Sequence, residues 1–159
     1  AVNGVAAGAG ASIVMACDLA VAASNASFIQ AFSKIGLIPD AGGTWFLIRK
    51  LGLARAMGCA MLGDKLSAQD AKAWGMIWDV APEGEDCVAA AMKLAQRLAV
   101  LPTQALVQTR KLLRAAASND LDRQLDMERD TQSALGGTHD YIEGVSAFLQ
   151  KRPAQFKGE

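Results

Sequence analysis

The sequence has little of the chemistry that metal sites and disulfide frameworks require. His139 is the only histidine among 159 residues, which excludes a metal site built from several histidines and leaves little room for a Ser-His-Asp triad. The three cysteines, Cys17, Cys59 and Cys87, are widely spaced and form no C-x-x-C pair, so they indicate neither a zinc site nor a disulfide framework. We interpret them as reduced thiols and expect a cytoplasmic protein without a bound metal.

Net charge and long apolar runs are also absent. The 16 Lys and Arg residues balance the 16 Asp and Glu residues, whereas a nucleic-acid partner would require a basic face that neutralises phosphates. The apolar run over residues 13–23 is too short to cross a membrane and is interrupted by Asp18. We therefore expect neither nucleic acid nor membrane as a partner. Hydrophobic residues make up 52% of the chain, enough for the core of one domain or of a piece of a larger one.

The composition changes along the chain, which predicts two regions, 1–82 and 83–159. The first is rich in Gly, Ala and short apolar runs, and the second is more charged and has helical spacing. In the first, the patterns predict a strand end at 1–4, strands within 18–24, 26–30 and 76–82, and helices over 8–17, 44–51, 54–62 and 67–75. In the second, they predict helices over 88–100, 105–116 and 119–135 and a last helix from 140.

The opening stretch "NGVAAGAGAS" is rich in glycine but does not match a nucleotide-binding loop. A dinucleotide fingerprint would need glycine at Ile13, and a P-loop would need Gly-Lys-Ser/Thr. A loop of tiny residues before a helix can still present backbone N–H groups to a polarised carbonyl oxygen, as an oxyanion hole does. Glycine and alanine also permit close packing of a helix on a strand. The residues alone leave both interpretations open.

Asp40, in "GLIPDAGGTW", has two interpretations as well. It follows Pro39 and precedes a predicted helix, which is typical of an N-cap. A carboxylate at the edge of a pocket can equally move a proton. Ser12 lacks a G-x-S-x-G elbow, so we do not expect it to be a nucleophile.

Five stretches resemble the crotonase (enoyl-CoA hydratase/isomerase) superfamily in order and spacing: "AVNGVAAGAG", "ACDLAVAASNASF", "KIGLIPDAGGTWFLIRKLG", "LGDKLSAQDAKAWGMIWDV" and "DYIEGVSAFLQKRPAQFKG". The resemblance implies an α/β fold, a crotonase-like ββα spiral followed by a C-terminal helical region that assembles trimers or dimers of trimers. It also implies that the chain is the later two-thirds of a subunit. We therefore expect an incomplete spiral and an isolated chain that is inactive.

Proteins of this superfamily transform acyl-CoA thioesters through an enolate-like intermediate, whose oxygen is held by two backbone N–H groups. The resemblance places one of these donors at Ala9, between Gly8 and Gly10. The two glutamates of hydratases match Ser12 and Phe32, which cannot exchange a proton as a carboxylate does. The resemblance therefore argues against an ordinary hydratase mechanism.

Asp40 stands where hydratases usually have glycine, and an acid there resembles the ring-1,2-epoxyphenylacetyl-CoA isomerases of phenylacetate degradation. One carboxylate can remove a proton and return it elsewhere, so the resemblance implies an isomerase with Asp40 as acid and base. Coenzyme A would be part of the substrate and no separate cofactor is expected. The residues expected to line the substrate site are Gly8, Gly10, Ser12, Ala31 and Phe32.

The C-terminal stretch "AFLQKRPAQFK" combines aromatic and basic residues. By resemblance, Phe148 and Lys151 would contact the nucleotide part of coenzyme A. Within the superfamily, the alternatives are an enoyl-CoA hydratase or a dienoyl-CoA isomerase. An alternative of another class is a non-catalytic fragment that serves assembly only.

Overall fold

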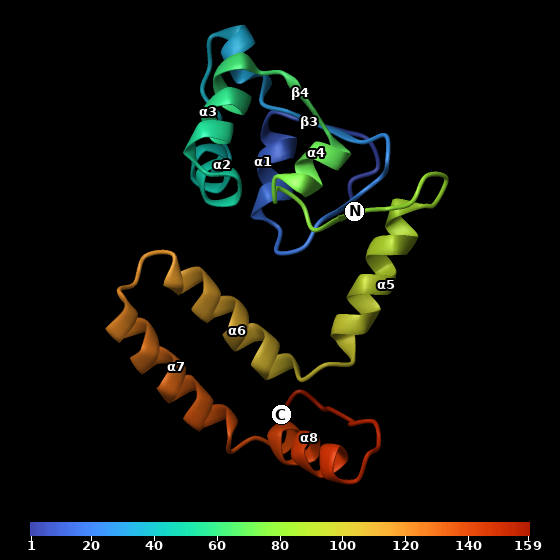
Figure 1. Ribbon diagram of the computed structural model, residues 1–159, viewed down its shortest axis with the longest axis vertical. Coiled ribbons are helices and arrows are strands. Elements are labelled where there is room, and N and C mark those ends of the chain that lie inside the picture. The colour runs from blue at the N-terminus through green and yellow to red at the C-terminus, as the bar shows by residue number, and fades with distance from the viewer. The chain divides into compact units, whose positions relative to one another are not determined.

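The structure, a computed structural model, describes residues 1–159, which form two compact units, Ala1–Leu94 and Ala95–Glu159. The first unit is mixed α/β and the second is helical (Figure 1). Helix α5 (Cys87–Ala99) spans the boundary between the units, and Cys87 at its start packs in an apolar cluster with Val21 and Ala81 of the first unit. The division after residue 82 stays a prediction from composition.

Two small sheets organise the first unit. Strand β1 (Val5–Ala7) pairs in parallel with β3 (Ser27–Ile29), and β3 pairs antiparallel with β4 (Lys65–Ser67). Strand β2 (Val21–Ala22) pairs in parallel with β5 (Asp79–Val80). The strand predicted at residues 1–4 is displaced, since only Val2 makes a bridge there, to Ala22, and β1 begins after Gly4. The sequence pattern did not predict β4.

Glycines and a serine cap mark ends of the helices in the first unit. Gly52 and Gly63 end two of them with φ angles of 74° and 63°, a conformation that glycine adopts at little cost. Ser67 caps another by accepting a hydrogen bond from the Asp70 N–H at 3.0 Å. A short 3₁₀ helix, η1 (Ala31–Ile35), was not predicted. The four α-helices are α1 (Ala9–Ala16), α2 (Gly43–Leu51), α3 (Leu53–Leu62) and α4 (Ala68–Ala73).

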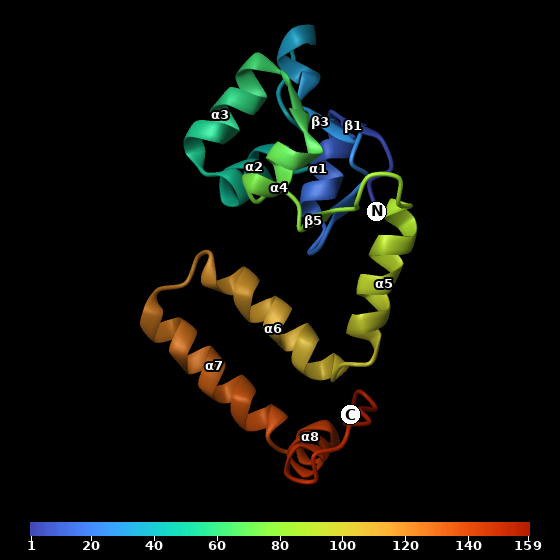
Figure 2. The same ribbon diagram turned by 45° about the vertical axis from the view of Figure 1, so that its right-hand side comes forward.

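The core of the first unit surrounds α1. Met15 of α1, Phe28 of β3, Leu47 of α2 and Met76 are its largest fully buried apolar side chains. Figure 2 shows α1 close to α2 and to the strands, and its contacts are with α2 and β1. Small residues along α1 permit these close approaches, so packing is one role of the Gly- and Ala-rich opening.

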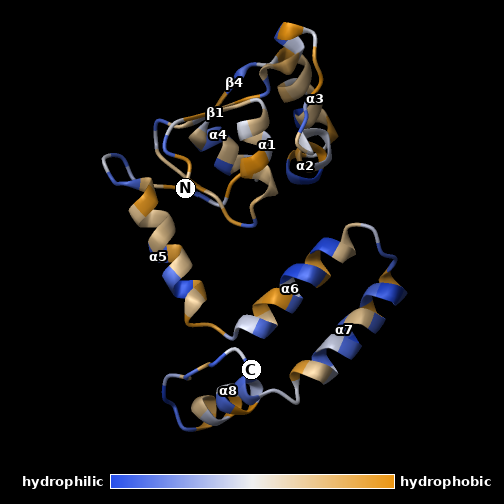
Figure 3. Cartoon of the chain, turned by 180° about the vertical axis from the view of Figure 1, so that it is seen from behind, coloured by the Kyte–Doolittle hydropathy of each residue, from blue (hydrophilic) through white to orange (hydrophobic).

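The second unit contains three complete helices, α6 (Thr103–Ala116), α7 (Leu121–Leu135) and α8 (His139–Leu149). Helices α6 and α7 lie side by side as a hairpin (Figures 1 and 2). Neither helix has a fully buried residue. Figure 3 shows hydrophobic residues interspersed with hydrophilic ones along both.

The chain after α8 folds back and is held by two carboxylates of that helix. Asp140 accepts hydrogen bonds from the N–H groups of Lys157 at 2.7 Å and Gly158 at 2.8 Å. Glu143 accepts two hydrogen bonds from the Arg152 guanidinium, at 2.6 and 2.8 Å, and one from the Gln155 N–H. The C-terminal segment is therefore an ordered part of the unit. No helix in the chain is long and apolar enough to span a membrane.

Candidate functional site

The glycine loop between β1 and α1 presents backbone N–H groups at the start of a helix. Gly8 has φ 54° and ψ −126°, which favour glycine, and its N–H donates to the Ile29 carbonyl of β3 at 2.8 Å. The loop is thereby anchored to the sheet. The N–H groups of Ala9 and Gly10 lie in the first turn of α1, where no earlier helical carbonyl can accept them. Their geometry suits an oxyanion donor, and that role stays a prediction.

Helices α1 and α2 run in the same direction, and the start of α2 lies beside the first turn of α1. A methyl group on Gly43, the first residue of α2, would lie 2.6 Å from Ser12 Oγ and 3.0 Å from Pro39 Cβ. At the other end of the pair, Lys50 Nζ donates to the Cys17 carbonyl at 3.4 Å. Contacts at both ends fix the parallel arrangement. The positive ends of the two helix dipoles therefore converge near Ser12 and Pro39.

Phe32 forms an apolar wall beside the glycine loop. It is 8% exposed, and a methyl group on Gly8 would lie 3.5 Å from Phe32 Cζ. Ser12 is completely buried and its hydroxyl donates to the Gly8 carbonyl at 3.5 Å. The structure thus brings together Gly8, Ser12 and Phe32, three of the residues expected at the substrate site. Ala31, half-buried, lies beside Phe32 at the start of η1.

Asp40 is not the N-cap of α2, so that expectation is wrong. Gly42 occupies the cap with φ 76°, and no side chain caps the helix. Ala41 and Gly42 both have positive φ angles, which turn the backbone before α2. As a result, the backbone carbonyl of Asp40, and not its carboxylate, accepts a hydrogen bond from the Gly43 N–H, at 2.7 Å. The Asp40 side chain is exposed, beside Pro39 and the start of α2.

Ala41, the residue after Asp40, has a φ of 48°, which is uncommon for a residue with a Cβ atom. Backbone strain of this kind persists only where the surroundings hold it, and it clusters at functional sites. The acid therefore belongs to a constrained segment between η1 and α2. Its predicted role in proton transfer stays a prediction.

The sequence interpretation did not include Gln30, which the structure marks as unusual. It is 3% exposed, and neither atom of its amide has a hydrogen-bond partner. It lines a cavity of about 10 Å³ with Ala11 and Cys59, behind the glycine loop. Buried amides without partners are rare in proteins. A glutamine at the end of an apolar strand, directly before the predicted pocket residues, was the signal available in the sequence.

Phe148 and Lys151 belong to the second unit and lie at the end of α8. Phe148 is 82% exposed and lines an apolar groove of about 570 Å³ together with Leu135, Tyr141 and Phe156. Lys151 is exposed and donates its backbone N–H to the Phe148 carbonyl at 3.2 Å. The two residues are neighbours, and their contact with coenzyme A stays a prediction.

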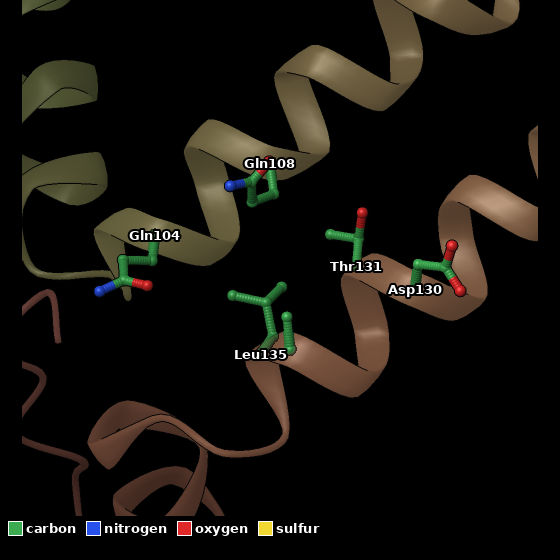
Figure 4. A pocket seen from close by; sticks show the side chains of 6 residues that line it. Gln104, Gln108, Asp130, Thr131 and Leu135 are labelled. Carbon is green, nitrogen blue, oxygen red and sulfur yellow. The ribbon is translucent and has the colours of Figure 1, made fainter.

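A second cavity of the same unit lies between α6 and α7 and has a volume of about 310 Å³. Both polar and apolar residues line it: Gln104 and Gln108 from α6, and Asp130, Thr131 and Leu135 from α7 (Figure 4). None of the predicted site residues lies there. No group of three or more His, Cys, Asp or Glu side chains in the chain is arranged to hold a metal ion.

A helix that begins on a glycine loop beside the strands is consistent with the α/β fold that the crotonase resemblance implies. The enoyl-CoA hydratase/isomerase family model matches residues 1–159, so the chain belongs to this family. The expected α/β fold is confirmed by solved structures. The chain superposes on an enoyl-CoA hydratase from Polaromonas sp. JS666 with a TM-score of 0.93 and 40% identity, over 97% of this chain and 60% of that one.

A putative enoyl-CoA hydratase/isomerase from Mycobacterium abscessus gives a TM-score of 0.95 at 35% identity, over 98% of this chain and 60% of that one. Among curated relatives, the chain is 54% identical over its whole length to the 1,2-epoxyphenylacetyl-CoA isomerase of Escherichia coli K12. It is 47% identical, over 99% of its length, to a probable enoyl-CoA hydratase of Rhodobacter capsulatus. It spans 60% and 61% of the lengths of these two relatives.

Proposed function

We propose that the protein to which this chain belongs is an acyl-CoA isomerase, and that its substrate is an aromatic-derived thioester such as 1,2-epoxyphenylacetyl-CoA. The observation that carries the proposal is the carboxylate of Asp40. It is exposed, it is not used as a helix cap, and it is adjacent to the point where α1 and α2 begin. The 54% identity to the Escherichia coli isomerase supports the choice of substrate.

In the proposed reaction, the thioester carbonyl oxygen accepts the N–H of Ala9, and its developing negative charge lies at the positive end of α1. One preorganised donor of this kind lowers a barrier by roughly 3 kcal/mol. The family resemblance assigns no second donor to these 159 residues. Asp40 removes a proton next to the carbonyl and returns it at another carbon, so the product is an isomer of the substrate.

Ser12 and Phe32 favour isomerisation over hydration. A hydratase must activate a water molecule with a carboxylate, and neither side chain can do so. The buried phenyl ring of Phe32 beside Gly8 instead excludes water from the thioester and offers an apolar surface to an aromatic acyl group. Coenzyme A would be held as part of the substrate, with Phe148 and Lys151 as candidate contacts and no separate cofactor.

The first experiment replaces the proposed acid. In the full-length protein, we expect Asp40→Asn to lower the turnover of 1,2-epoxyphenylacetyl-CoA by at least about 100-fold, because the amide cannot exchange a proton at neutral pH. The assay is product formation followed by chromatography. The matched control is Glu83→Gln, which neutralises an exposed carboxylate in the loop after β5 and is expected to leave turnover unchanged. Normal turnover of Asp40→Asn would contradict the assignment.

A solvent-exchange experiment separates the proposed isomerase from a hydratase, the activity that the name of the Rhodobacter capsulatus relative suggests. In deuterated water, an isomerase that uses Asp40 incorporates deuterium into the thioester without adding water. Mass spectrometry of the recovered thioester distinguishes the two products. Net hydration of an enoyl-CoA at a comparable rate would favour the hydratase.

A further inference from the structure

The hydroxyl of Ser12 is buried next to the glycine loop and has a single acceptor. Ser12 lies in α1, and its side chain is completely buried. Its Oγ donates to the Gly8 carbonyl at 3.5 Å. A methyl group on Gly43 of α2 would lie 2.6 Å from Oγ, so α2 closes over the hydroxyl. Because the side chain is shut off from solvent, water does not compete for this hydroxyl.

The acceptor belongs to the same peptide unit as the proposed oxyanion donor. The Gly8 carbonyl and the Ala9 N–H are the two polar groups of one trans peptide unit, which is planar, so they point in opposite directions. A bond that fixes the direction of the carbonyl therefore fixes the direction of the N–H as well. Ser12 reaches the carbonyl and leaves the N–H free for a thioester oxygen.

This peptide unit needs such a bond because a glycine precedes it. The plane of the unit turns with ψ of Gly8, which is −126°, outside the helical range. The hydrogen bond from the Gly8 N–H to the Ile29 carbonyl, at 2.8 Å, holds the preceding peptide unit and not this one. The Gly8 carbonyl accepts from the Ser12 N–H at 3.2 Å and from the Ser12 hydroxyl. Ser12 thus supplies both hydrogen bonds.

We propose that Ser12 is a positioning residue, whose hydroxyl orients the Gly8–Ala9 peptide unit and strengthens the Ala9 N–H as a donor to the thioester oxygen. The inference rests on the proposed function, which uses this N–H. A hydrogen bond to the carbonyl polarises the peptide unit and makes its N–H a stronger donor. A donor that is already in place when the charge develops needs no reorganisation. In this role Ser12 touches no substrate and exchanges no proton.

The kinetic test compares two alanine variants of the full-length protein. Ser12→Ala removes the 3.5 Å contact with the Gly8 carbonyl. The control, Cys17→Ala, removes a contact of the same length and spacing at the other end of α1, from Cys17 Sγ to the Ile13 carbonyl. Loss of a whole donor costs about 100-fold or more, and here the donor is only weakened, so we expect Ser12→Ala to lower kcat about tenfold. KM should change less than about twofold, because the bond acts on the charge of the transition state. Cys17→Ala should change neither.

A spectroscopic test requires no turnover. The probe is phenylacetyl-CoA with an isotope-labelled thioester carbonyl, which lacks the epoxide. On the parent protein, we expect infrared spectroscopy to show a lower carbonyl stretching frequency after binding, because the Ala9 N–H polarises the bond. The decrease should be smaller on Ser12→Ala and unchanged on Cys17→Ala. Since Asp40 takes no part in this measurement, the result is independent of the isomerase assignment.

The two readouts separate the outcomes. Alanine is smaller than serine and favours a helix, so Ser12→Ala is expected to fold, which circular dichroism checks. A lower kcat together with a smaller frequency decrease supports the proposal. An undiminished decrease on Ser12→Ala, a kcat equal to that of Cys17→Ala, or no decrease on the parent protein would each overturn it. If the parent protein does not isomerise the epoxide, the proposed function fails, and the frequency alone decides the role of Ser12.

Discussion

At the scale of single residues, Gly43 determines how closely α2 approaches α1. A Cβ atom there would lie 2.6 Å from Ser12 Oγ and 3.0 Å from Pro39 Cβ, distances at which atoms must move apart. Because Pro39 is fixed to Asp40, any such movement would also shift the proposed acid. Glycine at this position is therefore required by packing at the site itself.

We predict that Gly43→Ala lowers the free energy of unfolding by about 1–3 kcal/mol, the usual cost of overpacking. Urea denaturation measures the change. Gly58→Ala is the control, because nothing lies within 4 Å of its added methyl group in α3 and the alanine favours the helix. Adding Ser12→Ala to Gly43→Ala should recover part of the loss, since the Pro39 contact remains. A loss no larger than that of Gly58→Ala would contradict the packing argument.

Asp40 shows why a local pattern is ambiguous at this scale. An acid after proline and before a helix is typical of a cap, yet the positive φ angles of Ala41 and Gly42 move the cap to Gly42. The carboxylate is left without a capping role. The backbone geometry of these two residues therefore excludes the cap, one of the two roles that the local sequence supports, and the role in proton transfer stays a prediction.

At the scale of elements, α8 and the segment after it form one unit through two carboxylates. The hydrogen bonds from Arg152, followed by that from the Gln155 N–H, lower the pKa of Glu143 to about 2. Burial acts to raise the pKa of Asp140, but the hydrogen bonds from the N–H groups of Lys157 and Gly158 act to lower it. The net shift of the pKa is downward. Both carboxylates are therefore charged when the segment is docked.

The sign of these shifts predicts how docking depends on pH. A carboxylate whose pKa is lower in the folded state stabilises that state above its ordinary pKa and loses the contribution as pH falls toward the folded value. We predict that the segment after α8 stays docked above about pH 4.5 and detaches as the pH approaches about 2. The amide NMR signal of Gln155, which donates to Glu143, reports the change.

A variant separates this effect from general acid unfolding. Glu143→Gln at pH 7 should shift the Gln155 amide signal in the same direction, because the charge that Arg152 and Gln155 contact is removed. Glu85→Gln, in the exposed loop before α5, should not. A Gln155 signal that is insensitive both to Glu143→Gln and to acid would show that other contacts hold the segment.

At the scale of the whole molecule, helices α6 and α7 leave large apolar side chains in solvent. Leu113 and Leu121 are each 70% exposed, and neither helix has a fully buried residue. Apolar surfaces of this kind mark interfaces between proteins. They support the proposal, drawn from the family resemblance, that the protein assembles as a trimer or a dimer of trimers.

We predict that Leu113→Glu or Leu121→Glu shifts the protein to smaller species in light scattering coupled to size-exclusion chromatography, because a buried, unpaired carboxylate is costly at an interface. Ser133→Glu, at an exposed polar position of α7, is the control and should leave the mass unchanged. A monomeric protein, or variants with the mass of the parent, would contradict assembly through these helices.

The elements that the sequence predicted well are those with local causes. Helices α2, α3 and α4 begin and end within about two residues of the predicted positions, because Gly52, Gly63 and the Ser67 cap act on their immediate neighbours. Strand β4 was missed because three residues carry little periodic signal, and its strand character comes from pairing with β3, more than thirty positions earlier. The strand predicted at residues 1–4 was displaced to β1 for the same reason, because β1 is also short and its strand character comes from pairing with β3.

The sequence by itself determined the helical segments, the zero net charge, the family, and the absence of a carboxylate at positions 12 and 32. Each of these depends on residue identity or on neighbours along the chain. Only the tertiary structure decided that the Phe32 ring lies against Gly8 and that Ser12 packs against Gly43. It also decided that the N-cap of α2 is Gly42 and not Asp40. It alone brought the Lys50 amine within hydrogen-bond distance of the Cys17 carbonyl, 33 residues away along the chain. These arrangements depend on the close packing of α1 against α2, a contact between distant segments that no local pattern specifies.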